Sequence, residues 1–275
     1  MTTAQPESQG RTIGSLLRGW RKTRSLSQLA LAQEAEVSPR HICFLETGRA
    51  RPSREMVMLL CRVLDVPLRE RNGLLLAAGF APAYTEARLE APELGAVQAA
   101  LLAILRQQEP FPAVVMNRHW DIVHANEGAL RFFRLLLGLR AAEPANVVRL
   151  MFDPDGLRPH VTNWEAVAEA LVQRVHREAV GYVRDPATAT LLAEVLAYPG
   201  VPRRLTRLNL AAPSVPVIPV RFEKDNQAFN YFSTVTTLGT PQDVTLQELR
   251  IECFFPADAA TEDRARALRD SDRGA

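Results

Sequence analysis

Apolar residues recur at helical spacing along five successive segments of residues 10–79. The first predicted helix covers roughly 11–23, the fourth covers 53–64, and the fifth covers 67–79. Two shorter helices lie between the first and the fourth. The pattern therefore predicts an all-α N-terminal domain of five helices.

The two short helices carry clear start signals and are separated by a tight turn. Ser27 is a good N-cap for the first of them, and Glu36-Val37 makes the turn. Ser38 caps the second helix, with Pro39 at the first helical position, where its missing N–H costs nothing. This order of elements predicts a helix, a turn and a second helix in close succession.

The second short helix has an apolar inner side and a hydrogen-bonding, cationic outer side. Ile42 and Leu45 are expected to face inward, which leaves Arg40, His41 and Phe44 pointing outward. Such a helix fits the DNA major groove, where arginine can bind guanine and histidine can donate to a base or phosphate. Phe44 either contacts a thymine methyl group or packs against a neighbouring helix or a partner subunit.

The loop after this helix is rich in arginine. Gly48 is predicted to supply the positive φ that ends the helix, and Arg49 and Arg51 follow it. These two side chains are candidates for phosphate contacts. The alternative is a solvated run of charge.

A second pattern begins after a proline-containing connection at 80–92. A helix at 93–107 is followed by short strands at 114–116 and 120–124, and by a helix that Asn126 caps. Further helices are predicted at 146–152, 163–181 and 187–197, and further strands at 215–222, 229–238 and 249–255. Residues 93–260 therefore predict an α+β domain with an antiparallel sheet, and 261–275 are assigned to a C-terminal tail.

Charge is distributed unevenly between the two regions. Residues 1–80 hold 12 Lys/Arg against 7 Asp/Glu, a balance of +5, whereas the remainder holds 21 against 24, a balance of −3. A basic N-terminal lobe on a mildly acidic body is consistent with a module that contacts DNA.

Several function classes lack support in the sequence. The three cysteines, Cys43, Cys61 and Cys253, have no metal-ligand spacing, and buried free thiols are expected. Neither a nucleophile elbow, nor a glycine-rich phosphate loop, nor a paired His/Glu metal motif occurs, so no enzyme, metal or cofactor is predicted. Without a signal peptide or a membrane-length apolar run, a cytoplasmic protein is expected.

The N-terminal region resembles the XRE (lambda repressor/Cro-like) helix-turn-helix family from about Ile13 to Leu76. The residues on the family pattern are Leu17, Arg21, Ser27-Gln28, Leu31-Ala32, Val37-Ser38, Ile42, Glu46, Gly48, Arg49 and Pro52-Ser53. The resemblance implies a lambda-repressor-like fold, a phosphate contact at Gln28, and an ion pair between Arg21 and Glu46. With these positions added, the predicted DNA-binding residues are Gln28, Ser38, Arg40, His41, Phe44, Arg49 and Arg51.

The C-terminal region resembles a PAS domain at NRHWDIVHAN (117–126), where a strand, a turn, a strand and an Asn-capped helix follow one another. Nearly all of 11–260 resembles the MmyB-like transcription regulators. The segments that carry this resemblance are RHICFLETGRARPSREM (40–56), PLRERNGLLLAAGFAPAY (67–84), NRHWDIVHAN (117–126) and STVTTLGTPQDVTLQELRIECFFPAD (233–258).

The resemblance to the MmyB-like group implies a ligand domain that binds fatty-acid-like molecules. Apolar side chains are candidates for the wall of a ligand cavity, although most such residues are simply core. Basic or imidazole side chains are candidates for holding a carboxylate head group. The predicted ligand-binding residues are Val114, Met116, Trp120, His124, Phe133, Arg149, Trp164, Arg221 and Tyr231.

Together these features predict a regulator that binds a double-stranded DNA operator, responds to a small apolar or amphipathic ligand, and works as a homodimer. Two alternatives remain open at this point. The second domain could only dimerise or contact a protein partner, or it could sense redox state or carry haem or flavin.

Overall fold

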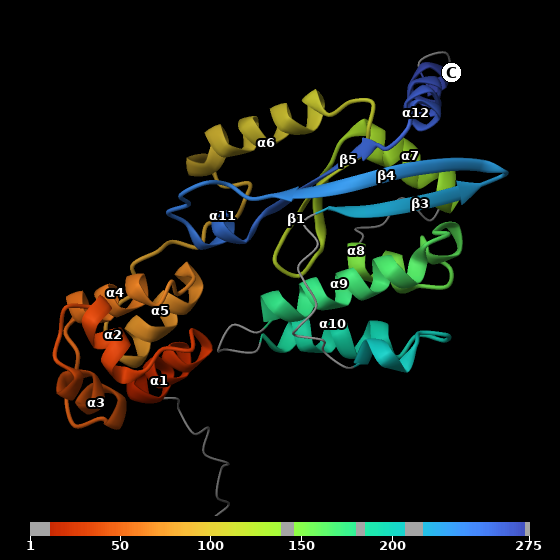
Figure 1. Cartoon of the computed structure of the whole chain (residues 1–275). Helices are drawn as coiled ribbons and strands as arrows, with labels where there is room; N and C mark the ends of the chain where they lie inside the picture. The colour runs from red at the N-terminus through yellow and green to blue at the C-terminus, as the bar shows by residue number, and fades with distance from the viewer. Residues whose placement is uncertain (1–11, 139–145, 180–184, 207–216, 273–275) are drawn as a thin grey trace, which may run out of the picture. The chain divides into compact units, whose positions relative to one another are not determined.

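The computed structural model describes residues 12–138, 146–179, 185–206 and 217–272. They divide into two compact units. The first comprises the residues up to Glu86 together with Gln242–Val244, and the second comprises the remaining residues from Ala87 onward; Glu86 lies within the segment predicted to connect two domains. The first unit holds five helices, and the second combines helices with one sheet (Figure 1).

The first unit is all-α, as the hydrophobic pattern predicts. Its helices are α1 (Ile13–Thr23), α2 (Gln28–Glu34), α3 (Pro39–Thr47), α4 (Arg54–Val63) and α5 (Leu68–Ala77). Ser27, Ser38 and Ser53 each accept a hydrogen bond from the backbone N–H three residues later, at 3.0, 3.1 and 3.2 Å. The predicted caps at Ser27 and Ser38 are therefore confirmed, Ser53 caps α4 in the same way, and the three serines fix where α2, α3 and α4 begin.

One apolar core joins these helices. Its largest fully buried members come from all five helices and the loop after α4, and α1 lies so close to α3 that a glycine is needed between them. A Cβ on Gly14 would stand 2.6 Å from the carbonyl oxygen of Leu45. The buried core side chains include Leu17, Trp20, Leu31, Ile42, Leu45, Leu60, Leu64, Leu74 and Leu75.

The second unit is built on a five-stranded antiparallel sheet of order β2-β1-β5-β4-β3. The strands are β1 (Ala113–Met116), β2 (Ile122–Ala125), β3 (Ile218–Lys224), β4 (Gln227–Thr236) and β5 (Arg250–Pro256). Helices α6 (Gly95–Gln107), α7 (Glu127–Leu137), α8 (Val147–Phe152), α9 (Trp164–Ala179), α10 (Pro186–Leu196), α11 (Val244–Glu248) and α12 (Ala259–Asp272) complete the description. This is the predicted α+β architecture.

Two different layers of helices cover the two faces of the sheet (Figure 1). On one face Leu101 and Leu105 of α6 pack against Val115 and Ile251. On the other face α7, α8, α9 and α10 enclose the larger core, in which Phe132 packs edge-to-face on Phe222, Phe229 and Tyr231, with centroid distances of 5.0, 5.4 and 5.5 Å. Because strand residues alternate between faces, neighbours along one strand belong to different cores.

At two places, backbone conformation makes a strand begin or end at a different residue from the one the sequence pattern predicts. The predicted strand at 120–124 begins only at Ile122, because Trp120 has a φ of 69° and its N–H donates to the carbonyl of Asn117 at 3.1 Å. Between β3 and β4 the turn residues Asp225 and Asn226 have φ values of 49° and 60°, as a tight two-residue hairpin requires.

The segment assigned to a C-terminal tail is helical instead, because α12 runs to Asp272 and is anchored to β4. Thr261 is fully buried and its hydroxyl oxygen accepts the N–H of Asn230 at 2.9 Å. Arg264 donates to the carbonyl of Ala228. The hydrophobic pattern does not predict this helix, because many of its residues are charged and it has almost no apolar stripe.

Candidate functional site

The outer side of α3 is arranged as the sequence predicts. Ile42 and Leu45 are each 1% exposed and lie in the core, whereas Arg40 is exposed and His41 and Phe44 are half-buried. Gly48 has a φ of 74° and ends the helix, as expected. The helix thus presents one arginine, one imidazole and one aromatic ring on the side away from its own core.

Phe44 carries two guanidinium groups over its ring. The Cζ atom of Arg40 lies 5.1 Å from the ring centroid, and that of Arg49 lies 6.0 Å away. The carbonyl of Phe44 also accepts the N–H groups of Arg49 and Ala50, at 2.9 and 3.2 Å. Cation–π attraction therefore gathers two positive charges at one aromatic side chain, one before and one after the end of α3.

A buried carboxylate ties α1 and α2 to the end of α3. The Nε of Arg21 lies 2.6 Å from Oε1 of Glu46, and its Nη2 lies 2.9 Å from Oε2. The Glu46 side chain is 1% exposed. Burial raises the pKa of Glu46, but the hydrogen bonds from Arg21 and Gln28 and the charges of Arg21 and Arg18 together outweigh it and leave the pKa below its usual value.

The placement of Gln28 does not support the predicted phosphate contact through its amide nitrogen. Its Nε2 donates to Oε2 of Glu46 at 2.8 Å, because the buried carboxylate needs more donors than Arg21 supplies. Ser38 caps α3, and Arg49 and Arg51 are both exposed. Of the seven predicted DNA-binding residues, Gln28 is therefore the one whose side chain is turned into the protein.

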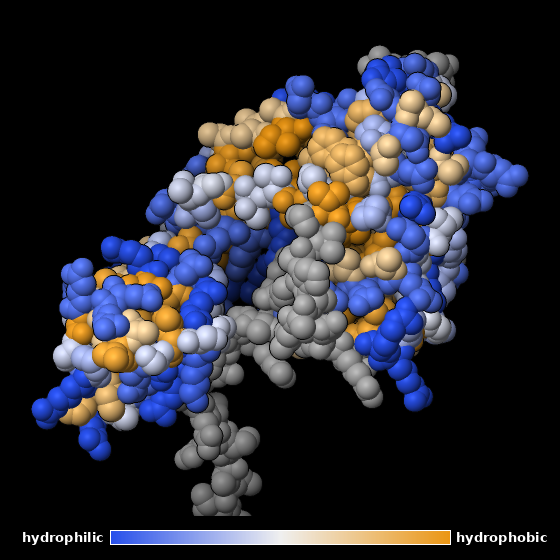
Figure 2. Space-filling model, in the orientation of Figure 1, coloured by the Kyte–Doolittle hydropathy of each residue, from blue (hydrophilic) through white to orange (hydrophobic). Residues whose placement is uncertain are grey.

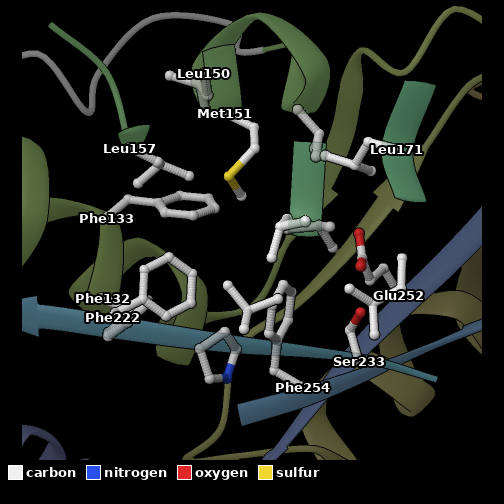
Figure 3. Close-up of a pocket in the computed structure, with 16 residues that line it drawn as sticks. Phe132, Phe133, Leu150, Met151, Leu157, Leu171, Phe222, Ser233, Glu252 and Phe254 are labelled. Carbon is white, nitrogen blue, oxygen red and sulfur yellow. The ribbon is translucent and has the colours of Figure 1, made fainter. Parts of the chain in front are cut away.

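The second unit contains an apolar cavity of about 40 Å³ between the sheet and helices α7, α8 and α9 (Figure 3). Four of its lining side chains, Phe133, Val147, Leu150 and Phe254, are half-buried and the others are buried. The full lining is Pro112, Val114, Phe132, Phe133, Val147, Leu150, Met151, Leu157, Val167, Leu171, Ile218, Val220, Phe222, Ser233, Glu252 and Phe254.

Only two of the predicted ligand-binding residues, Val114 and Phe133, line this cavity. Met116, Trp120 and Tyr231 belong to the same core but lie outside the lining. Trp164 is held at the edge of the core, where Arg158 stacks on its ring at 4.1 Å and its indole N–H donates to the carbonyl of Met151 at 2.7 Å. Packing explains the burial of Met116, Tyr231 and Trp164, whereas the buried indole N–H of Trp120 has no hydrogen-bond partner in the described structure.

The three polar residues predicted to hold a head group all lie away from the cavity. His124 pairs with Val115 across β1 and β2, on the sheet face that α6 covers. Arg221 alternates with Val220 and Phe222 and is exposed on the outward side of β3. Arg149 forms a bidentate ion pair with Glu194 on the outside of α8, with Nε 2.8 Å from Oε1 and Nη2 2.9 Å from Oε2.

The polar groups that do line the cavity, Glu252 and Ser233, were not predicted as binding residues. Burial raises the pKa of Glu252 above its usual value, although a hydrogen bond from the Ser233 hydroxyl and the positive charge of Arg174 both lower it. The sequence contains a signal for this site. Glu252 is the one carboxylate inside the apolar run LRIECFF, where both faces of the strand are covered.

Two of the three cysteines in the described structure are shielded from solvent. Cys61 and Cys253 are buried and Cys43 is partly exposed, and all three are free thiols. Burial raises the pKa of Cys61 to about 12, which suppresses the reactive thiolate. Within the described ranges, no group of three or more His, Cys, Asp or Glu side chains could hold a metal ion.

Two family profiles match the chain. The helix-turn-helix domain profile matches residues 12–74, which contain α1 to α4 and most of α5. The profile of the MmyB-like transcription regulator ligand binding domain matches residues 97–268, more than half of the chain. The chain belongs to the MmyB-like transcription regulators. This MmyB-like regulator is therefore a DNA-binding protein with a small-molecule ligand domain, as the resemblance predicts.

Other comparisons add little to this assignment. Among curated proteins, none matches this MmyB-like regulator significantly. A solved structure of an RNA-binding light-oxygen-voltage receptor covers 100% of this chain and 69% of its own, at 13% identity and a TM-score of 0.25, which is too low to support an argument. Among the described residues, no helix combines the length and apolar character needed to cross a bilayer.

Proposed function

We propose that α3 enters the major groove and that Arg40 and His41 read base edges there. The exposed guanidinium of Arg40 and the half-buried imidazole of His41 stand on the outer side of the first turns of α3, where helix-turn-helix proteins contact bases. Arg49 and Arg51, in the following loop, are placed to contact phosphates. Phe44 keeps Arg40 and Arg49 together at the surface through its ring.

Two arginine substitutions distinguish these roles. Arg40→Ala is expected to cost about 1–3 kcal/mol on the cognate operator and to relax discrimination at one base pair. Arg51→Ala is expected to weaken binding to all duplexes alike and to reduce the slope of log affinity against log salt by about 1. Lys224→Ala, which removes a positive charge from the β3–β4 hairpin of the other unit, is the control. Equal losses for Arg40→Ala on every duplex would contradict base reading.

We infer that the effector is a fatty-acid-like amphipath that enters the cavity beneath β4 and β5. The observation that carries this inference is the cavity lining, which is apolar except for Glu252 and Ser233 at one end. Its volume of about 40 Å³ is far below the roughly 300–1,000 Å³ of ligand sites, so that side chains must move before a chain can enter. The half-buried Phe133 and Leu150 are placed to do so.

Ligand extraction and binding measurements test this part of the proposal. Mass spectrometry of the purified protein should find bound lipid, or the protein should bind decyl-chain compounds in calorimetry, at about 0.8 kcal/mol per buried methylene. Phe133→Ala should alter the affinity because it opens the wall of the cavity. Leu130→Ala, on the exposed side of the same helix, should not. Absence of binding by wild type and by Phe133→Ala would contradict a ligand cavity.

A second candidate role for this unit is self-association. Helix α6 leaves Leu102 and Ile104 exposed at 42% and 39%, and its residues from Gly95 to Leu105 include no charged side chain. Figure 2 shows apolar side chains gathered over this helix. We propose that two copies pair through α6, so that a homodimer reads two half-sites about one helical turn apart.

A further inference from the structure

The solvent side of α6 combines small side chains with two large apolar ones. Leu101 and Leu105 lie on the opposite side of the helix, where they pack on the sheet. The small residues are exposed and recur at helical spacing, at Ala96, Ala99, Ala100 and Ala103. Leu102 and Ile104, exposed at 42% and 39%, flank this row. Because alanine side chains are short, a second helix can pack closely against this side of α6.

The two ends of α6 carry opposite charges. Glu93 belongs to the 3₁₀ turn Pro92–Leu94, which leads directly into α6, and Arg106 belongs to the last turn of the helix. Both residues are exposed, and neither forms an ion pair with any other residue that the structure describes. No charged residue stands between them in the sequence. The solvent side of α6 therefore runs from an unpaired acid to an unpaired base.

A hollow of about 480 Å³ adjoins the basic end of α6. Its wall includes the exposed Leu102, so the hollow continues the apolar surface of the helix. The charged residues of the wall are Arg106, Arg131, Arg269, Glu109 and Glu127. Arg131 is paired with Glu109, whereas Arg106 has no such partner in the described ranges. Arg106 is therefore available to a carboxylate that arrives from another molecule.

Two copies of α6 complement each other when they lie antiparallel. In a two-fold symmetric contact, residue i of one copy faces residue j of the other, and j faces i. With the axis between Ala99 and Ala100, alanines face alanines, and Glu93 is level with Arg106 of the partner subunit at both ends of the pair. A parallel pair would set Glu93 against Glu93 and Arg106 against Arg106, and such like-charge contacts are unfavourable.

We propose that two copies of the chain pair through α6 in antiparallel orientation, with Glu93 of each copy bound to the Arg106 side chain of the other. This inference rests on the proposed self-association through α6, and it adds the orientation and the ion pairs. An acid near the start and a base near the end also stabilise an isolated helix through its macrodipole. That effect acts within one chain, so it does not depend on the charges of a second copy.

Charge reversal in the full-length chain tests the orientation. Glu93→Arg and Arg106→Glu each place like charges at both ends of the antiparallel pair, and each should raise the dissociation constant of the dimer about tenfold at low salt. The double variant with both reversals brings opposite charges together again, and its dissociation constant should return to within about threefold of wild type. Sedimentation equilibrium over a concentration series measures these constants.

Two reversals elsewhere on the sheet are the controls. Glu223→Arg and Lys224→Glu make the same changes of charge on the edge strand β3, which contributes no residue to the core beneath α6. Both should leave the dissociation constant unchanged. Circular dichroism checks that every variant keeps its helix content. High salt should reduce the effect of the two α6 reversals, because exposed charges are screened.

The outcomes separate this inference from the proposed self-association. Weakening by each single reversal, with recovery in the double variant, supports the antiparallel pair. Single reversals that leave the dimer unchanged, or a double variant that does not recover, overturn it, and pairing through α6 still stands if Leu102→Glu dissociates the dimer. A monomeric wild type, or a dimer that Leu102→Glu does not affect, contradicts the proposed self-association, and the inference fails with it.

Discussion

At the scale of single residues, Glu46 joins three helices of the first unit through its buried carboxylate. Its two oxygens are buried and receive hydrogen bonds from Arg21 and Gln28. Glu46→Ala removes the carboxylate partner of the Arg21 guanidinium, and we expect a loss of about 3–5 kcal/mol in the free energy of unfolding. Denaturant unfolding of the full chain measures it, with the exposed Glu34→Ala on α2 as control.

The same change should abolish DNA binding through loss of the folded lobe. A Glu46→Ala protein that stays folded and still loses affinity would place Glu46 at the DNA interface instead. Acid should imitate the substitution. Because the folded-state pKa lies below the usual 4.5, the stabilisation is complete above that value and is lost as the pH falls through the lower folded-state pKa.

At the scale of elements, the contact between α1 and α3 depends on a missing side chain. Alanine at position 14 would gain helix propensity, but its Cβ would meet the carbonyl oxygens of Leu45 and Glu46 at 2.6 and 2.7 Å. Gly14→Ala should therefore destabilise the first unit by about 1–3 kcal/mol, since backbone atoms cannot rotate away. Thermal unfolding measures the change.

Gly73 supplies the matched control for this prediction. It lies on the exposed side of α5, and a Cβ there would meet no heavy atom within 4 Å. Gly73→Ala should therefore stabilise the unit by up to about 1 kcal/mol through helix propensity alone. A stabilising Gly14→Ala would show that the two helices can separate at little cost.

Elements were predictable wherever local signals agree with burial. The serine caps, the apolar spacing of the first five helices and the alternation along β4 are all local, so the sequence contains them. Helix α12 was not predicted because its stabilising contacts, such as the hydrogen bond from Asn230 to Thr261, join residues 31 positions apart. No local pattern reports such a contact.

The candidate site also has a part that the sequence predicts and a part that it does not. The outer side of α3 follows from helical periodicity, and Arg40, His41 and Phe44 lie where that periodicity places them. The cavity depends on strand register, and a shift of one residue moves a side chain to the other face. His124 and Arg221 were assigned by residue type, whereas β1–β2 pairing and the alternation of β3 turn both away from the cavity.

At the scale of the whole molecule, the apolar surface of α6 leads us to predict how two copies of the chain assemble. Leu102→Glu places a charge among the uncharged residues from Gly95 to Leu105 of α6, and it should shift the proposed dimer toward monomer. Sedimentation over a concentration series measures the shift. Leu130→Glu, a comparably exposed leucine on α7, should leave the dimer intact. A monomeric wild type would refute pairing through α6.

The small volume of the cavity leads to a prediction about ligand binding and operator binding. A chain can enter about 40 Å³ only if side chains of α7 and α8 move, so the liganded unit must differ in structure from the empty one. If the two forms bind operator differently, saturating ligand should change operator affinity by about 5- to 150-fold. Thermodynamic linkage then demands that saturating operator change ligand affinity by the same factor.

Measuring both factors tests whether the two changes in affinity are equal, as linkage requires. Operator titrations with and without decanoate give one factor, and decanoate titrations with and without operator give the other. Equal factors different from one establish that the cavity and α3 belong to a single switch. If the cavity is filled and operator affinity is unchanged, the protein binds the ligand but the ligand does not regulate DNA binding. A ligand that binds two conformations equally well does not change their populations.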